Sequence, residues 1–326
     1  MTEYFLEDDE LFIPYLNKYS SHFLGKNVLI CGGSESGKTT LVNDIVKKLT
    51  NDVPVVVRFS HDCSNDLDEK VERLQGEYNM RLTIENLSKL IEHQKKCMRI
   101  HSITNNIDLL NSICLKTNDE KFNTIVEMVN QDAERFSKLA DTQYKDPGLR
   151  HAEKTKIKTM QQSTLKTLYR NCIDTHKESL LSQTLSSEEL IAINYTNLNS
   201  NLVCIFDECE QFLREHQKDS VLMDIIFSGR VHNMTRIFTY QCDRHIYPVI
   251  RRAMDALIFT TFQDAMSHFN TASNAYDRQT RNLAERVIAR IFKVENGIRT
   301  YRKLAFLPHS ESSKFNCILA GDDLLF

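Results

Sequence analysis

The stretch Val28-Leu-Ile-Cys-Gly-Gly-Ser-Glu-Ser-Gly-Lys-Thr-Thr40 decides the fold. Its apolar run, 28–31, is typical of a buried strand and ends at two glycines. Residues 32–39 match the phosphate-binding pattern G-x-x-x-x-G-K-[ST], and apolar residues at helical spacing follow. Glycines let backbone N–H groups turn toward a phosphate, where a Cβ would clash. The pattern predicts a strand, a loop that binds a nucleoside triphosphate, and a helix that begins near Lys38.

The residue types of this loop suit phosphate chemistry. A helix N-terminus presents unpaired N–H groups to an anion. Lys38 is expected to reach the β- and γ-phosphates, and the Thr39 hydroxyl is expected to bind Mg²⁺. Four of the 9 glycines of the chain lie between positions 25 and 37, which supports this interpretation. The predicted nucleotide-binding residues are Gly32, Gly33, Ser34, Glu35, Ser36, Gly37, Lys38, Thr39 and Thr40.

A second motif, Leu202-Val-Cys-Ile-Phe-Asp-Glu208, has five apolar residues followed by two carboxylates. This is the form of a Walker B element, which completes a triphosphate site. Asp207 is expected to hold Mg²⁺ opposite Thr39, and Glu208 is expected to polarise the attacking water. The expected cofactors are therefore ATP and Mg²⁺, and Glu208 favours hydrolysis over binding alone.

The composition is that of a soluble globular protein. The chain has 326 residues, 41% hydrophobic and 26% charged, and its net charge of −3 excludes a uniformly basic nucleic-acid coat. No run has the length of a transmembrane helix, and the acidic N-terminus does not resemble a signal peptide. The nine cysteines include no C-x-x-C pair, which indicates reduced, mostly buried thiols of an intracellular protein.

Three segments are expected along the chain. Residues 1–63 are predicted to form an N-terminal leader and the first part of an ATPase core. Residues 64–200 are predicted to be an α-helical insertion, because their apolar residues recur at helical spacing. Residues 201–326 are predicted to complete the core with a C-terminal helix and strands.

Local signals add detail to these segments. Further strands are predicted at 53–59, 234–241 and 256–262, and Pro147-Gly148 marks a turn between two long helices. Asn296-Gly297 is a hairpin signal. Residues 150–177 carry seven Lys or Arg against two acids, which is either a solvated helix face or a face that contacts phosphates.

An ordered series of residues resembles the poxvirus-type DNA-packaging ATPases of large DNA viruses, within the FtsK/HerA superfamily of P-loop translocases. The matching stretches are roughly 27–60 and 200–262. The series consists of Phe206-Asp-Glu208, Gly229-Arg230 with Asn233, Gln241, Arg244-His245-Ile246 and Arg251. The chain departs from the family at Glu35, where relatives commonly have a small residue, and in the length of its helical insertion.

The resemblance implies a RecA-like P-loop NTPase of the α/β class, with a mainly parallel sheet and a large α-helical insertion. It places the 234–241 strand between the P-loop and Walker B strands, and Gln241 near the γ-phosphate as a sensor. It also implies a homo-oligomeric ring around double-stranded DNA, in which a neighbour's arginine completes each site. The candidates are Arg230, Arg251 and Arg252, of which Arg251 is favoured.

The function implied is an ATP-hydrolysing motor that packages double-stranded viral DNA into a capsid. Its expected partners include capsid or membrane-associated assembly proteins, and its expected location is the viral factory of the host cytoplasm and the virion. Two other functions remain open. One is a phosphotransferase of the nucleoside-kinase type with the helical segment as a lid. The other is a nucleotide-dependent scaffold whose helical hairpin docks a partner.

Overall fold

The computed structural model describes residues 5–8, 11–16, 19–63, 76–242, 246, 248–293, 302–311 and 313–319. The chain divides into two compact units. Residues 1–95 and 200–326 form the core unit, and residues 96–199 form the helical unit. No hydrophobic cluster is shared by the two units among the described residues.

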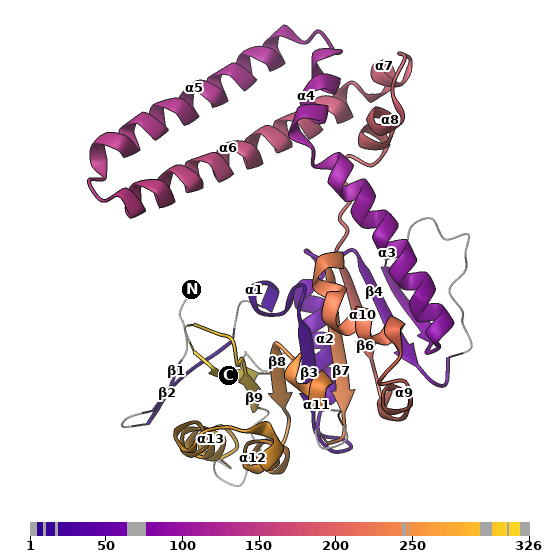
Figure 1. Ribbon diagram of the computed structural model, residues 1–326, viewed down its shortest axis with the longest axis vertical. Helices are drawn as coiled ribbons and strands as arrows, with labels where there is room; N and C mark the ends of the chain where they lie inside the picture. Colours follow the sequence, from indigo (N-terminus) through magenta and orange to yellow (C-terminus); the bar gives the residue numbers. More distant parts are fainter. Residues whose placement is uncertain are drawn as a thin grey trace. The chain divides into compact units, whose positions relative to one another are not determined.

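The core unit is built on an eight-stranded sheet with the order β10-β9-β8-β3-β7-β6-β4-β5 (Figure 1). The pairs from β8 to β5 are all parallel, whereas β9 and β10 are antiparallel additions at one side. Every residue of the four central strands is buried, as expected for parallel strands covered on both faces. The strands are β3 Asn27–Cys31, β4 Val55–Ser60, β5 Gly76–Arg81, β6 Leu202–Phe206, β7 Met234–Tyr240, β8 Ala256–Phe259, β9 Arg302–Phe306 and β10 Phe315–Leu319.

Alternating side chains of each strand fill two cores, one on each face of the sheet. Val28 and Ile30 of β3 pack with Leu41 and Ile45 of α2 on one face. Leu29 of β3 belongs to the core on the other face. The helices on the first face are α1 Tyr19–Phe23 and α2 Lys38–Leu49. Those on the second are the start of α3 Ile84–Thr104, α9 Glu210–Glu215, α10 Ser220–Ser228, α11 Pro248–Arg252, α12 Phe262–Asn270 and α13 Arg278–Ile291.

The sheet has the RecA-like arrangement that the resemblance implied. β7 lies between β3 and β6, so the 234–241 strand separates the P-loop strand from the Walker B strand as expected. The chain thus has an α/β P-loop fold with a mainly parallel sheet and a helical insertion. Short 3₁₀ helices η1 Gly229–His232 and η3 Ala272–Asn274 precede β7 and α13.

The predicted N-terminal leader packs against the side of this sheet. Its strands β1 Phe5–Asp8 and β2 Leu11–Pro14 pair antiparallel. The Leu16 amide donates to the Cys317 carbonyl of β10 at 2.9 Å, and Ile13 is fully buried. The leader is therefore joined to β10.

The helical unit is an antiparallel hairpin with three short helices at one end (Figure 1). Its core gathers Leu110, Phe122, Tyr169 and Ile193. Pro147 is the first residue of α6, and the Asp146 side chain caps that helix, so the predicted turn lies just before Pro147. The helices are α4 Ile107–Leu115, α5 Glu120–Gln143, α6 Pro147–Thr175, α7 Lys177–Leu181 and α8 Ser187–Asn194.

The far half of the hairpin leaves apolar side chains uncovered. Phe136 is 54% exposed and Met160 is 62% exposed. These side chains line a groove of about 540 Å³ between α5 and α6, together with Val129 and Ile157. The apolar residues that recur at helical spacing in α5 and α6 are therefore only partly buried.

The helical region is narrower than the predicted 64–200. Residues 76–81 form β5, a parallel strand at the end of the sheet beside β4, and the start of α3 also belongs to the core unit. The strand escaped prediction because five of its six residues are not buried, and only Met80 and the partly buried Tyr78 pack on the core. The Asn296-Gly297 signal lies outside the described residues.

Two further expectations concern thiols and membranes. All nine cysteines are free, and six of them are buried. Within the described part of the chain, no helix combines the length and the apolar character needed to cross a bilayer.

A pH-sensitive contact in the helical unit yields a prediction. Ser186 and Glu189 form a capping box at α8, and the Lys116 ammonium lies 2.6 Å from the Glu189 carboxylate. The hydrogen bonds from Lys116 and from the Ser186 amide lower the pKa of Glu189 below its ordinary value of 4.5. The stabilisation is therefore present above about pH 4.5 and is lost as the pH falls through the folded pKa.

We expect Glu189→Gln to destabilise the helical unit by about 0.5–1 kcal/mol at neutral pH and by much less near pH 3. Amide hydrogen exchange in α8, measured at both pH values, reports the difference. Glu188→Gln is the control, because Glu188 is exposed and adjacent. A loss that is the same at both pH values would contradict the ion-pair interpretation.

Candidate functional site

The loop between β3 and α2 has the shape of a phosphate-binding loop. The Gly32 amide donates to the Tyr240 carbonyl at 3.0 Å, which ties the start of the loop to the end of β7. The Lys38 ammonium is buried within the loop and donates to the carbonyls of Gly32 and Gly33, each at 2.9 Å. The predicted lysine is therefore folded over the loop, close to where phosphates would lie.

Gly32 and Gly37 of this loop occupy positions where a side chain would be unfavourable. A Cβ on Gly32 would lie 1.7 Å from the Thr260 hydroxyl and 2.5 Å from the Ser36 hydroxyl. Gly37 has φ 87° and occupies the N-cap of α2, where it supplies no side-chain acceptor to the first turn. The N–H groups of that turn consequently stay available to a bound anion.

Ser36 is buried, and the four remaining predicted loop residues face outward. Ser34, Glu35, Thr39 and Thr40 are exposed, and Glu35 has a left-handed φ of 57°. The Thr39 hydroxyl lies in the first turn of α2. From there it would reach a metal ion held between the loop and the Walker B strand.

One hydroxyl of the neighbouring strand binds both Walker B residues, one through its carboxylate and the other through its backbone amide. Thr239 of β7 donates to Asp207 Oδ1 at 2.7 Å and accepts from the Glu208 amide at 3.1 Å. Glu208 is exposed and has a left-handed φ of 51°, a conformation that costs energy for a non-glycine residue. Strain of this kind concentrates where a side chain must point into a site.

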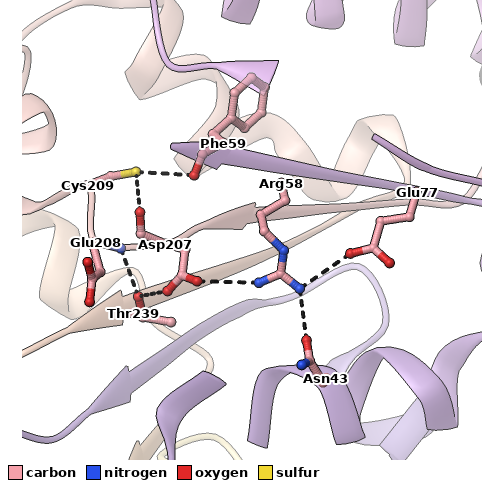
Figure 2. Close-up of polar contacts among 8 residues, drawn as sticks. All are labelled: Asn43, Arg58, Phe59, Glu77, Asp207, Glu208, Cys209 and Thr239. Atoms are coloured by element: carbon pink, nitrogen blue, oxygen red, sulfur yellow. Dashed lines mark hydrogen bonds and ion pairs between the residues drawn. The ribbon is translucent and has the colours of Figure 1, made fainter. Parts of the chain in front are cut away.

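A cluster around Arg58 of β4 holds the other side of Asp207 (Figure 2). The Arg58 guanidinium lies 3.4 Å from Asp207 Oδ2 and 3.4 Å from Glu77 of β5, and it donates to Asn43 of α2 at 2.9 Å. Asn43 lies one helical turn after Thr39, so the arginine joins the helix to the Walker B strand. Both oxygens of Asp207 therefore have partners within the protein.

The pKa values of two buried groups near these carboxylates are raised. Burial, with Asp207 and Glu208 nearby, raises the pKa of Cys209 to about 12, and its thiol contacts the Asp207 carbonyl at 3.0 Å. Burial and the neighbouring Glu210 raise the pKa of Tyr240 above its ordinary value. The Cys209 thiol therefore stays protonated at neutral pH.

Gln241 follows β7 directly, next to the residue whose carbonyl binds the Gly32 amide. Its side chain is exposed, and its own amide donates to Glu210. The predicted sensor position is thus at the same side of the sheet as Lys38 and Glu208. We call this side, formed by the carboxyl ends of the parallel strands, the carboxyl edge.

The arginine candidates lie at the opposite, amino edge of the sheet. The Arg230 side chain lies 3.9 Å from the position of a Cβ on Gly25, which precedes β3. Arg251 donates to Asn274 at 2.6 Å and to the Ile246 carbonyl at 3.1 Å, near the point where the chain enters β8. Arg230 and Arg252 are exposed. Arg244 and His245 of the motif lie outside the described residues.

The Gly229 and Asn233 positions of the motif have structural roles. A Cβ on Gly229 would lie within 3 Å of the buried guanidinium of Arg236. Arg236 donates to Asn27 Oδ1 at 2.7 Å and to the Gly25 carbonyl at 3.2 Å, and burial lowers its pKa to about 10. Asn233 has a left-handed φ of 53° and donates to the Ser200 hydroxyl.

Four residues at the carboxyl edge were not predicted, namely Arg58, Thr239, Thr260 and Lys303. Thr239 and Thr260 lie in the last half of the predicted strands 234–241 and 256–262, so their position was the available signal. Lys303 on β9 is buried and donates to the Ser36 carbonyl at 2.9 Å. Nothing in its sequence neighbourhood marked it.

The residues present fit a Mg²⁺-bound nucleoside triphosphate. The loop offers backbone N–H groups and one lysine, and Gly37 leaves the first turn of α2 without a side-chain cap. Thr39 and Asp207 supply the hydroxyl and carboxylate oxygens that Mg²⁺ prefers beside phosphates. Among the described residues, no three or more His, Cys, Asp or Glu side chains gather into a metal site of their own.

Comparisons with known proteins identify viral relatives. No family model matches the chain. Uncharacterized proteins of several African swine fever virus isolates are 24% identical over 313 residues, which cover 92% of this chain and 83% of each relative. These matches link the chain to proteins of a large DNA virus.

Solved structures with a similar arrangement include a genome-packaging NTPase. The enzyme of Sulfolobus turreted icosahedral virus 2, in complex with ATPγS, has a TM-score of 0.43 and 9% identity, over 90% of this chain and 97% of that chain. The pCW3 conjugation coupling protein TcpA has a TM-score of 0.36 and 12% identity, over 99% of this chain and 72% of that chain. Similarity at this level carries no argument about function, so the fold assignment rests on the strand order described above.

The close contact at Gly32 yields a prediction about stability without nucleotide. We expect Gly32→Ala to lower the free energy of unfolding by about 1–3 kcal/mol, because the new methyl group overlaps the Thr260 hydroxyl. Urea unfolding of the nucleotide-free protein measures this loss. Gly33→Ala is the matched control, since no atom lies within 4 Å of its added Cβ. Equal stability of the two variants would contradict the packing described here.

Proposed function

We propose that the protein is an ATP-hydrolysing motor that translocates double-stranded viral DNA into a capsid. The observation that carries the hydrolytic part is the adjacency of β3, β7 and β6. This adjacency gathers Lys38, Glu208 and Gln241 at one edge of the sheet. A nucleotide bound there would meet a phosphate-binding loop and two carboxylates.

The roles of the residues follow from their chemistry and contacts. Bound Mg²⁺ would neutralise charge on the β- and γ-phosphates. Thr39 and Asp207 would hold it, and the Thr239 hydroxyl keeps the Asp207 carboxylate oriented. Glu208 would accept a hydrogen bond from the attacking water, because its exposed carboxylate stands at the strand end beside Asp207.

Gln241 would respond to the γ-phosphate. Its position directly after Tyr240 couples it to the loop, since the Tyr240 carbonyl accepts from the Gly32 amide. A change in the loop on hydrolysis would therefore reach the end of β7.

The motor part of the proposal rests on the resemblance of the motif series and on the exposed arginines. Arg230 and Arg252 lie away from the P-loop of their own chain, so either one would reach a phosphate only in a neighbouring subunit. A homo-oligomeric ring around duplex DNA would provide that neighbour. Arg251 makes two hydrogen bonds within its own chain and would have to release them to act in this way.

The viral setting of the proposal is supported by the relatives from African swine fever virus. The protein would act during virion assembly in the host cytoplasm, with capsid or membrane-associated assembly proteins as partners.

Two substitutions test hydrolysis. We expect Lys38→Ala to abolish nucleotide binding, because it removes the loop's own cation. Glu208→Gln should retain binding but lower phosphate release about 10²–10⁴-fold, because the amide cannot act as a base. Binding and turnover are measured separately on each purified variant. Glu215→Gln, an exposed change on α9, is the control, and a normal rate in Glu208→Gln would contradict the assignment.

A second experiment tests translocation. We expect duplex DNA to raise ATP turnover, and we expect this stimulation to fall steeply with added salt because Lys and Arg contact phosphates. Turnover is measured with and without duplex DNA across a salt series. A rate unaffected by any nucleic acid would overturn the motor while leaving the ATPase intact. Phosphate transfer to a nucleoside would favour the phosphotransferase instead.

A further inference from the structure

A second lysine lies against the phosphate-binding loop. Lys303 of β9 is only 5% exposed, and its ammonium donates to the Ser36 carbonyl at 2.9 Å and to the Thr260 carbonyl at 3.5 Å. It also lies 3.6 Å from the position that a Cβ on Gly37 would take. The ammonium therefore touches the turn of the loop immediately before α2.

The strand register brings Lys303 to this place. Phe259 of β8 pairs with Leu304 of β9, so Lys303 stands beside Thr260. Side chains alternate along β9, and Ala305 belongs to the core on the α2 face. Lys303 consequently points to the face on which the loop and α2 lie.

Ser36 is contacted by residues from the ends of two strands. The Ser36 hydroxyl lies 2.7 Å from the Thr260 hydroxyl, and its carbonyl accepts from Lys303. The loop is thus supported at Ser36 by the end of β8 and the start of β9. This support fixes the turn whose N–H groups face a phosphate.

The charge of Lys303 has a consequence for binding. Lys38, Lys303 and the N-terminus of α2 bring three sources of positive charge to the same eight-residue loop. A cation beside the positive end of a helix is unfavourable in isolation, but all three sources attract an anion placed between them. The arrangement suits a ligand with several negative charges.

We propose that Lys303 is a positioning residue of the nucleotide site that selects for polyphosphates. It holds the Ser36–Gly37 turn from behind, and its charge strengthens binding of ATP more than binding of AMP. This inference rests on the proposed nucleotide-binding function of the loop.

The test compares variants that separate charge from hydrogen bonding. Lys303→Met removes both, Lys303→Gln keeps a donor without charge, and Lys303→Arg keeps the charge. Lys314→Met, an exposed lysine between β9 and β10, is the control. Dissociation constants for ATP, ADP and AMP are measured by calorimetry on the full chain, and thermal unfolding without nucleotide shows which variants are folded.

We expect Lys303→Met and Lys303→Gln to weaken ATP binding about tenfold or more and AMP binding much less, because the lost charge acts on the additional phosphates. Lys303→Arg should restore most of the ATP affinity, and Lys314→Met should match the wild type. An equal loss for all three nucleotides, or unchanged affinity in the folded Lys303→Gln variant, would overturn the inference. Wild-type protein that binds no nucleotide would instead overturn the proposed function.

Discussion

The pairing of β7 with both β3 and β6 is the constraint on which the site depends. Register places Thr239 opposite Ile30 and Phe238 opposite Phe206, so the ends of three strands meet. A slip of one residue would turn Thr239 to the other face of the sheet. Asp207 and the Glu208 amide would then lose the hydroxyl that holds them. The Asp207 carboxylate and the Glu208 backbone are therefore held by a strand that carries neither residue.

Polar side chains buried at the two edges of the sheet have different tasks. At the amino edge, Arg236 and Asn27 bond to each other and to backbone carbonyls, which satisfies groups that would be costly to bury alone. At the carboxyl edge, Thr260 and Lys303 support the phosphate-binding loop. The first pair connects strands, whereas the second pair holds the loop at Ser36. Gly229 belongs to the motif series, but it lies at the amino edge and has a structural role there, because it packs against Arg236.

The helical unit buries its apolar residues mainly at one end of the hairpin. Its core is built where α4, α7 and α8 cover the hairpin, and there the apolar stripes of α5 and α6 are buried. Farther along the hairpin no other helix of the unit supplies such cover, and Phe136 and Met160 stay exposed. Helical spacing in a sequence shows which residues share a face. It does not show whether another element covers that face.

The sequence by itself determined the elements whose signal is local. Glycines at 32 and 37, the buried runs before them and before Asp207, and helical spacing were enough to predict the P-loop, the Walker B strand and the helical hairpin. The place of the 234–241 strand between them came from the resemblance of the motif series to a known family.

The tertiary structure alone decided which side chains meet across the sheet. Arg58, Thr239 and Lys303 act on residues up to 267 positions away, because strand order brings distant segments together. Only the tertiary structure revealed β5, because a strand at the end of a sheet can form from mostly polar residues with a single buried side chain, Met80. Local pattern records propensity and burial, whereas the contacts that orient the Asp207 carboxylate depend on register between strands.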